Sequence, residues 1–309
     1  QWSFGLQREL QRDFVFELNY VGSKGTHLVM KRNLNQPVPG PGDINSRRPI
    51  PGFSDILFVS SDASSTYHSL QARIEKRYAR GLSLLGVYTY AKAIDNSSSF
   101  LESKGDDNTP QNSTNIAAER GLSNFDLRHR FSGSFIYDLP VGRERRWTAP
   151  GGKWAGALLN DWQVSGIVTL QTGRPFTARL TSDNSNTGNV GGFFAHDRPN
   201  VVGDPHLDEP SPERFFDTNA FAISQRYTFG NAGRNVLIGP GLSNLDLAWL
   251  KNISIRPNHT LQFRAEFFNF FNHPNFKLPE SFIDNPATFG RILAAEHARQ
   301  IQFALKYLF

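Results

Sequence analysis

The residues best placed to do chemistry are charged side chains that recur at every second position in two otherwise apolar segments. Arg73, Glu75 and Arg77 follow this spacing in one segment, and Arg264 and Glu266 follow it in another. Side chains two residues apart share one face of a β-strand, so each set would lie on a single polar face. Such a face could bind a substrate, form a structural charge network, or simply meet water.

Candidate metal ligands are few. Asp106, Asp107 and Asn108 offer the oxygen atoms that calcium takes, but they lack EF-hand spacing, and clusters of Asp and Asn also favour turns. His129 stands alone between two arginines, whereas a zinc site needs three or four converging ligands. We therefore expect no metal site.

Enzyme motifs are also missing from the sequence. It has no Cys, no Gly-x-Ser-x-Gly turn, no His-Glu-x-x-His helix and no phosphate-binding loop. Carboxylate pairs such as Asp208 and Glu209 lie in a Pro-rich stretch without a strand or helix to position them. We expect neither enzyme activity nor a cofactor.

The charge balance does not indicate nucleic-acid binding. The net charge is +5, but the basic residues are scattered, and Arg143, Arg145 and Arg146 form the one tight cluster. No aromatic residues follow this cluster at the spacing of a base-stacking surface. We expect no nucleic-acid partner.

The elements that must position these side chains are β-strands. Apolar and polar residues alternate with a period of two, and aromatic residues, which favour strands, make up 13% of the chain. No run approaches the roughly 18 apolar residues of a transmembrane helix. The alternation predicts nine strands, at residues 2–7, 14–20, 70–77, 82–90, 131–139, 162–171, 245–249, 261–267 and 301–309.

Short and long connections alternate between successive strands. Short links at residues 11–13, 79–81 and 256–259 and a moderate link at 140–160 alternate with long ones at 31–65, 95–124, 173–241 and 273–298. Bacterial outer-membrane barrels show this pattern, with short periplasmic turns and long extracellular loops. The pattern predicts an all-β, antiparallel transmembrane β-barrel in the bacterial outer membrane, surrounded by its lipids.

The number of strands has a consequence for closure. If Phe309 ends on the periplasmic side, the apolar stretch from Ile56 to Val59 must be loop structure, and nine crossings remain. Bacterial single-chain barrels have an even number of strands. We therefore expect residues 1–309 to be the C-terminal segment of a larger barrel with an even number of strands, with Arg73, Glu75, Arg77, Arg264 and Glu266 facing its lumen.

Two C-terminal segments resemble a known family. Asn269, Phe270, Phe271 and Asn272 follow the strand at 261–267 and resemble the penultimate-strand motif of TonB-dependent receptors. Asn269, Phe271 and Asn272 could be functional, or they could form an ordinary strand end with aromatic and polar residues at the membrane rim. The chain ending resembles the outer-membrane β-signal; its alternating residues are Ile301, Phe303, Leu305, Tyr307 and Phe309. The likeness implies recognition by the barrel-assembly machinery.

Three further segments, at residues 118–131, 228–235 and 239–246, resemble the Oar-like receptors of this family, which carry an N-terminal carboxypeptidase-regulatory-like domain. The resemblance implies a whole barrel of about 22 strands. It also implies active uptake of an unknown nutrient ligand, captured by the loops at 31–65, 95–124 and 173–241. The signal peptide, TonB box, plug and regulatory-like domain are absent from residues 1–309, so a partnership with TonB is expected only through missing N-terminal parts.

Two alternatives remain open at this point. One is an outer-membrane barrel for adhesion or assembly that transports nothing. The other is a secreted, soluble β-rich protein that binds carbohydrate. A TonB box upstream in the parent gene would separate the first alternative from a transporter, and cell fractionation would separate the second.

Overall fold

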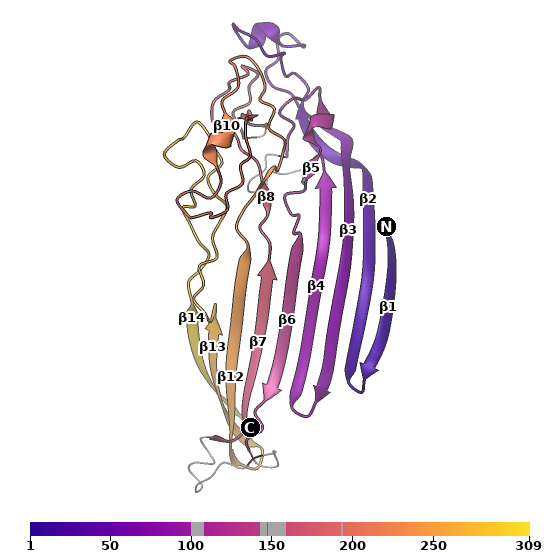
Figure 1. Ribbon diagram of the computed structural model, residues 1–309, viewed down its shortest axis with the longest axis vertical. Coiled ribbons are helices and arrows are strands. Elements are labelled where there is room, and N and C mark those ends of the chain that lie inside the picture. Colours follow the sequence, from indigo (N-terminus) through magenta and orange to yellow (C-terminus); the bar gives the residue numbers. More distant parts are fainter. Residues whose placement is uncertain (100–107, 143–146, 148–158, 193) are drawn as a thin grey trace.

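A single antiparallel sheet of long strands dominates the computed structural model, which describes residues 1–309 except 100–107, 143–146, 148–158 and 193 (Figure 1). The path β1-β2-β3-β4-β6-β7-β12-β13-β14 follows the chain order, and every neighbouring pair is antiparallel. These nine strands are β1 (Trp2–Gln11), β2 (Phe14–Asn33), β3 (Leu57–Ala79), β4 (Leu82–Asp95), β6 (His129–Asp138), β7 (Trp162–Gln171), β12 (Leu242–Arg256), β13 (His259–Phe268) and β14 (Gln300–Leu308). The predicted number and order of strands are confirmed.

Short elements occupy the connections. They are the 3₁₀ helices η1 (Asn45–Arg47), η2 (Ile116–Glu119) and η3 (Thr218–Ala220) and the strands β5 (Gly121–Leu122), β8 (Pro175–Phe176), β9 (Asn200–Val201), β10 (Phe221–Ala222) and β11 (Leu237–Ile238). β5 extends the main sheet beside β4, whereas β8 pairs with β11 and β9 pairs with β10 outside it. No helix in the described part of the chain is long and apolar enough to cross a membrane.

The two-residue alternation gives the sheet two chemically different faces. Phe4, Tyr20, Leu70 and Tyr90 are cross-strand partners on β1 to β4, and all four are exposed on the apolar face. The opposite face carries polar partners such as Glu17 and Arg73. Such a sheet suits a wall with lipid on one side and a polar lumen on the other. We call its apolar side the outer face and its polar side the lumen face.

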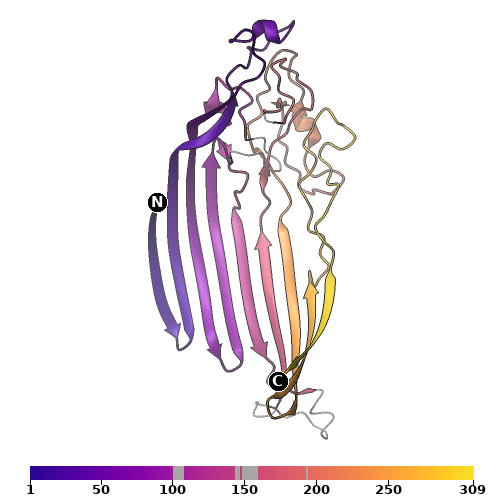
Figure 2. The same cartoon turned by 180° about the vertical axis from the view of Figure 1, so that it is seen from behind.

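The short connections turn within two residues. Asp13, Arg80 and Asn258 have positive φ angles of 77°, 54° and 62°, and Gly81 has one of 81°. Two-residue hairpins need such backbone angles because they match the twist of the paired strands. These turns lie at the end of the sheet opposite the long loops (Figures 1 and 2).

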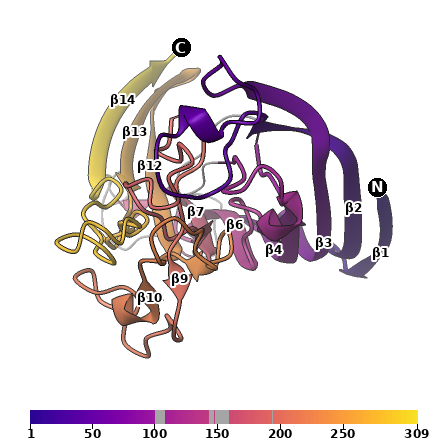
Figure 3. The same cartoon turned by 90° about the horizontal axis from the view of Figure 1, so that it is seen from above.

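The sheet curves into an arc when it is viewed from above (Figure 3). β1 and β14 are the two ends of the strand order, and in the described residues they do not pair with each other. All ten residues of β1 and eight of the nine residues of β14 are exposed.

One prediction about the loops is wrong. The stretch from Lys31 to Ser65 is not a loop throughout, because β2 continues to Asn33 and β3 begins at Leu57. Phe58 and Val59, predicted as loop, pair with Arg32 and Lys31. The register between β2 and β3 shifts twice, between Gly25 and Leu28 and between Leu28 and Met30, and the two strands stay paired beyond both shifts. β-Bulges of this kind bend a strand and break its alternation, so the polar pattern hid a continuous ladder.

Candidate functional site

The long loops fold into an ordered cap at one end of the sheet (Figures 1 and 2). We define this loop cap as residues 34–56, 108–128, 172–241 and 269–299. Part of it has its own hydrophobic core, where the Phe216 ring lies 5.2 Å from Phe289 and 5.9 Å from Phe221, centroid to centroid. Buried Phe176 and Leu237 complete that core. The core joins the β7–β12 and β13–β14 connections into one packed unit.

A buried amide cluster joins three loops near the top of the sheet. The Gln36 Nε2 atom donates to the Gln111 carbonyl oxygen at 2.9 Å and to the Asn189 Oδ1 atom at 3.0 Å. The Asn189 Nδ2 atom donates to the same Gln111 carbonyl at 2.9 Å. All three side chains are buried. Buried polar groups of this kind are costly unless paired, so the mutual bonds fix the relative positions of the three loops.

Two buried ion pairs lie beside this amide cluster. Arg198 Nη2 lies 2.5 Å from Glu119 Oε1, and these side chains are only 5% and 2% exposed. Arg234 pairs with Asp95, and its Nε atom donates to the Glu119 carbonyl oxygen at 2.9 Å. We call Asp95, Glu119, Arg198 and Arg234 the ionic lock. Removing one partner of a buried pair leaves a desolvated charge, which costs about 3–5 kcal/mol.

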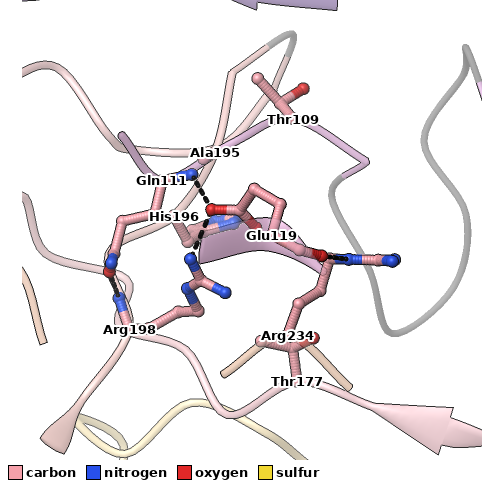
Figure 4. Close-up of a pocket in the computed structure, with 8 residues that line it drawn as sticks. All are labelled: Thr109, Gln111, Glu119, Thr177, Ala195, His196, Arg198 and Arg234. Atoms are coloured by element: carbon pink, nitrogen blue, oxygen red, sulfur yellow. Dashed lines mark hydrogen bonds and ion pairs between the residues drawn. The ribbon is translucent and has the colours of Figure 1, made fainter. Parts of the chain in front are cut away.

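A cavity of about 10 Å³ lies at the ionic lock (Figure 4). Its lining includes Thr109, Gln111, Glu119, Arg198 and Arg234. The Nε and Nη1 atoms of Arg198 are buried there without a hydrogen-bond partner among the described residues. Such a volume suits one water molecule and no larger ligand. The lock therefore supports the loops structurally and does not itself hold a nutrient.

Two carboxylates in the loop cap have pKa values displaced in opposite directions. Burial raises the pKa of Asp197 above 3.8, although the Ser185 backbone N–H and side chains of Ser185 and Asn189 donate to it. Burial also acts on Asp284, but hydrogen bonds from Thr181 and Ser182 prevail and hold the pKa of that carboxyl below 3.8.

A second cavity in the loop cap has the size of a small-molecule site. It measures about 370 Å³ and is lined by Pro205, Phe215, Phe216 and Leu237, with Asp204 and His206 among its polar groups. Ligand pockets are mostly apolar, with a few polar groups that orient the bound molecule. We call this cavity the loop pocket.

The predicted lumen-facing charges form separate pairs and do not converge on one site. Arg73 Nη1 lies 2.8 Å from Glu17 Oε1, and Arg73 also pairs with Glu75. Arg264 Nη2 lies 2.6 Å from Glu266 Oε1 on β13, and four strands separate β13 from β3. Arg77 lies in the register shift between Lys76 and Ala79 and makes no ion pair in the described part of the chain. The arrangement suits a structural charge network.

The family-motif residues build a turn after β13. Asn269 and Asn272 have positive φ angles of 52° and 54°, which Asn tolerates better than most residues. The Asn269 side chain accepts from the His273 N–H at 3.0 Å, and Asn272 accepts from the Arg299 N–H at 3.0 Å. Phe271 is 72% exposed. These contacts are those of a strand end whose side chains shape the turn.

The residues of the predicted assembly signal share one face of β14. Ile301, Phe303, Leu305 and Tyr307 pair with residues on the apolar face of β13, and all of them are exposed. Phe309 follows the strand and is 90% exposed. An exposed edge strand with alternating side chains can be recognised by strand addition. Recognition by the barrel-assembly machinery stays a prediction.

The remaining residues singled out in the sequence lie apart from one another. Five of them lie outside the described residues: Asp106, Asp107, Arg143, Arg145 and Arg146. Asn108 is buried, and its Oδ1 atom accepts from the Ser98 N–H at 3.1 Å. The His129 Nδ1 atom lies 2.7 Å from the Tyr88 hydroxyl. The described residues contain no group of three or more His, Cys, Asp or Glu side chains arranged to hold a metal ion.

The ionic lock was not predicted from the sequence, although a signal for it existed. Glu119 lies in the segment at 118–131 and Arg234 in the segment at 228–235, two of the stretches with a family resemblance. The structure brings these stretches together, since Asn235 Nδ2 donates to the Leu122 carbonyl oxygen at 2.7 Å. The loop pocket lies wholly within the predicted ligand loop at 173–241, but nothing in the sequence indicated which residues of that loop would line a cavity.

Comparison with known proteins agrees with this architecture. The family described as outer membrane beta barrel domain matches residues 1–302. The outer membrane transporter YddB from Escherichia coli is similar in structure, with a TM-score of 0.50 and 12% sequence identity over 99% of this chain. BauA, the ferric preacinetobactin receptor from Acinetobacter baumannii, gives a TM-score of 0.47 and 12% identity over 99% of this chain. The sequence matches none of the curated proteins with which it was compared.

The chain spans 31% of YddB and 29% of BauA. At such low identity the likeness to YddB concerns the fold alone, and it agrees with the observed sheet of nine long antiparallel strands with an apolar and a polar face. The family match covers almost all of the residues. The chain therefore belongs to the outer membrane β-barrel domain family and resides in the bacterial outer membrane.

Proposed function

We propose that this chain is the C-terminal part of the barrel of a TonB-dependent receptor of the Oar-like group, which takes up a nutrient across the outer membrane. The observation that carries the proposal is the loop cap: four connections are locked together at one end of a wall with a polar lumen face. A fixed cap can present a binding surface without the ordering cost that free loops incur on binding. The fold that this chain shares with YddB and the motifs at 118–131, 228–235 and 269–272 are consistent with the same assignment.

The loop pocket is the proposed point of first contact with the nutrient. Its volume of about 370 Å³ falls within the range of small-molecule sites. Val236 and Ile238 line it and are 43% and 47% exposed, so their side chains are accessible from solvent. The paired charges Arg73, Glu75, Arg264 and Glu266 would line the route below the loop cap. Energy would come from TonB through parts of the protein outside residues 1–309.

An uptake experiment with the full-length parent tests this proposal. Cells that lack the gene would be complemented with the parent gene and supplied with ferric siderophore, cobalamin, glycan or peptide as the limiting nutrient. We expect growth on one nutrient class, and we expect that growth to be lost when TonB is deleted. Growth that needs neither the parent gene nor TonB would contradict the proposal and favour adhesion or assembly.

A pocket variant tests where the ligand first binds. Val236→Asp places a charge on an exposed position of the loop pocket, so we expect weaker nutrient binding at unchanged protein level. Val38→Asp is the matched control, because Val38 is 77% exposed in another loop and does not line this pocket. Equal uptake by the parent and both variants would remove the loop pocket from the proposed route.

A further inference from the structure

An apolar groove opens on the outer face near the loop cap. It has a volume of about 640 Å³. Its floor consists of Tyr88, Phe131 and Leu170, which are direct cross-strand partners on β4, β6 and β7. Pro274 and Phe276 from the β13–β14 connection also line it. The groove is therefore continuous with the lipid-facing side of the wall but is bounded by loop residues.

A cluster of Lys, Arg and His side chains adjoins this groove. The His129 Nδ1 atom lies 2.7 Å from the hydroxyl of Tyr88, which belongs to the groove floor. The His129 ring centroid lies 5.1 Å from that of Tyr90, and the Arg128 guanidinium lies 6.0 Å from the Tyr90 ring. Lys92 is two residues beyond Tyr90 on the same face of β4 and is exposed. The Arg128 and His129 side chains thus contact aromatic rings beside one end of the apolar groove, and Lys92 follows on the same face of β4.

The charge of this cluster is only partly neutralised by its neighbours. Arg128 lies 3.7 Å from Asp126, but the other oxygen of that carboxylate accepts the Ala93 backbone N–H at 2.6 Å. Lys92 makes no ion pair within the residues that the structure describes. Cations held beside a membrane surface attract anionic headgroups, and phosphate oxygens are good acceptors for Arg and Lys.

We infer that the groove and the Lys92, Arg128 and His129 cluster together bind a phosphate-bearing lipid of the outer leaflet. An acyl chain would cover Tyr88, Phe131 and Leu170, and the phosphate would lie against the cations. Free phosphate would satisfy the charges but leave the groove uncovered. The continuity of the groove with the lipid-facing wall favours a lipid over a protein partner. This inference concerns the wall and is independent of the proposed transport.

Native mass spectrometry of the full-length parent in detergent micelles tests the site, with phosphorylated lipid A as the probe. We expect the parent to retain lipid A at concentrations where dephosphorylated lipid A and zwitterionic phosphatidylethanolamine dissociate. Each cation near a membrane surface contributes about a fivefold change in affinity. The double variant Lys92→Gln/Arg128→Gln should therefore bind lipid A about 25-fold more weakly.

Two further variants separate the lipid site from a general charge effect. Phe276→Ser alters a loop residue of the groove while leaving every cation in place, and it should also weaken retention of lipid A. Arg8→Gln removes an exposed cation from β1, near the short-turn end of the wall, and should bind lipid A like the parent. Far-ultraviolet circular dichroism would confirm that each variant keeps its strands.

Three results would overturn the inference. The first is equal retention of phosphorylated and dephosphorylated lipid A by the parent. The second is unchanged retention by the Lys92→Gln/Arg128→Gln protein in its folded state. The third is binding of inorganic phosphate at the cluster together with unchanged lipid A binding by the Phe276→Ser variant, because the groove would then play no part.

Discussion

The wall and the loop cap are stabilised in opposite ways. In the wall, apolar side chains such as Phe4 and Phe303 lie exposed on the outer face, and paired charges such as Glu17 and Arg73 lie on the lumen face. In the loop cap, phenylalanine side chains are buried together. The ionic lock, which ties the cap to Asp95 at the end of β4, is buried as well. The wall is arranged for lipid and the cap for water. One chain therefore needs two different rules to explain where its polar residues lie.

Breaking the ionic lock should have the largest effect. Glu119→Ala leaves Arg198 charged, buried and without its carboxylate, so the loop cap should lose about 3–5 kcal/mol of stability while the wall is unchanged. Hydrogen exchange of peptides from 108–128 and 194–241 in the full-length parent would measure the loss.

The matched control for this prediction lies in the wall. Glu17→Ala removes one of the two carboxylate partners of Arg73, from a pair whose side chains are 23% and 33% exposed, and should cost at most about 1 kcal/mol. Equal effects of the two substitutions would show that burial does not distinguish the two regions.

A charge placed on either face of β7 tests the wall itself. Val168 partners Gly133 and Leu245 on the outer face, so Val168→Arg should be destabilising, by up to about 2–4 kcal/mol. Thr169→Arg puts the same charge on the lumen face and should cost much less. Urea unfolding in lipid vesicles measures both values, and a larger cost for Thr169→Arg would reverse the assignment of the two faces.

A side chain added where two backbone segments of the loop cap lie close together should have a smaller destabilising effect. A Cβ atom on Gly230 would lie 2.0 Å from the Arg198 carbonyl oxygen, so Gly230→Ala must displace backbone next to the ionic lock. We expect a cost of about 1–3 kcal/mol, seen as faster proteolysis of the loops. Gly40→Ala is the control, because its nearest neighbour is an Arg47 side-chain atom at 3.6 Å. Resistance of both variants to protease would argue against close packing at Gly230.

The smallest expected effect is a difference in pH response within the loop cap. Asp284 has a lowered pKa, so its stabilising contribution is present above pH 3.8 and is lost as the pH falls through its folded pKa. Asp197 has a raised pKa, so its contribution is present below pH 3.8 and is lost as the pH rises through its folded pKa.

Hydrogen exchange, corrected for the intrinsic effect of pH, checks this difference. As the pH is lowered from neutrality towards 3.8, protection at residues 183–192 and 194–198 should rise in the parent, and Asp197→Asn should abolish that rise. Protection at residues 179–182 should be lower in Asp284→Asn than in the parent at neutral pH. Falling protection of both segments over this range would contradict the assigned directions.

The same contrast explains how much of the fold was predictable. The nine wall strands were readable because each alternates over many residues, as in 261–267 and 301–309, and lipid imposes that alternation. The extensions of β2 and β3 were missed because the bulges after Gly25 reset the pattern. The short strands of the loop cap, such as β8 and β11, are two residues long and carry no periodic signal.

The candidate site was predictable only in part. The loops were identified from their lengths, but their contacts join residues far apart in the chain, such as Gln36 and Asn189 at a separation of 153 positions. A single sequence contains no measure of that proximity. The lumen-facing charges were identified from their spacing. Their ion pairs, however, lie within one strand or between two neighbouring strands, and the register of those strands is set by the turns that join them.

The Gln111 carbonyl oxygen, which accepts hydrogen bonds from both Gln36 and Asn189, has a consequence for how this protein can change over generations. Surface loops usually vary independently, because each is anchored only at its own ends. Here an insertion that shifts Gln111 withdraws the acceptor from two other loops at once. Sequence variation between relatives should therefore be concentrated at exposed loop positions such as Val38 and Phe53. The buried loop segments around Gln36, Gln111 and Asn189 should change only together.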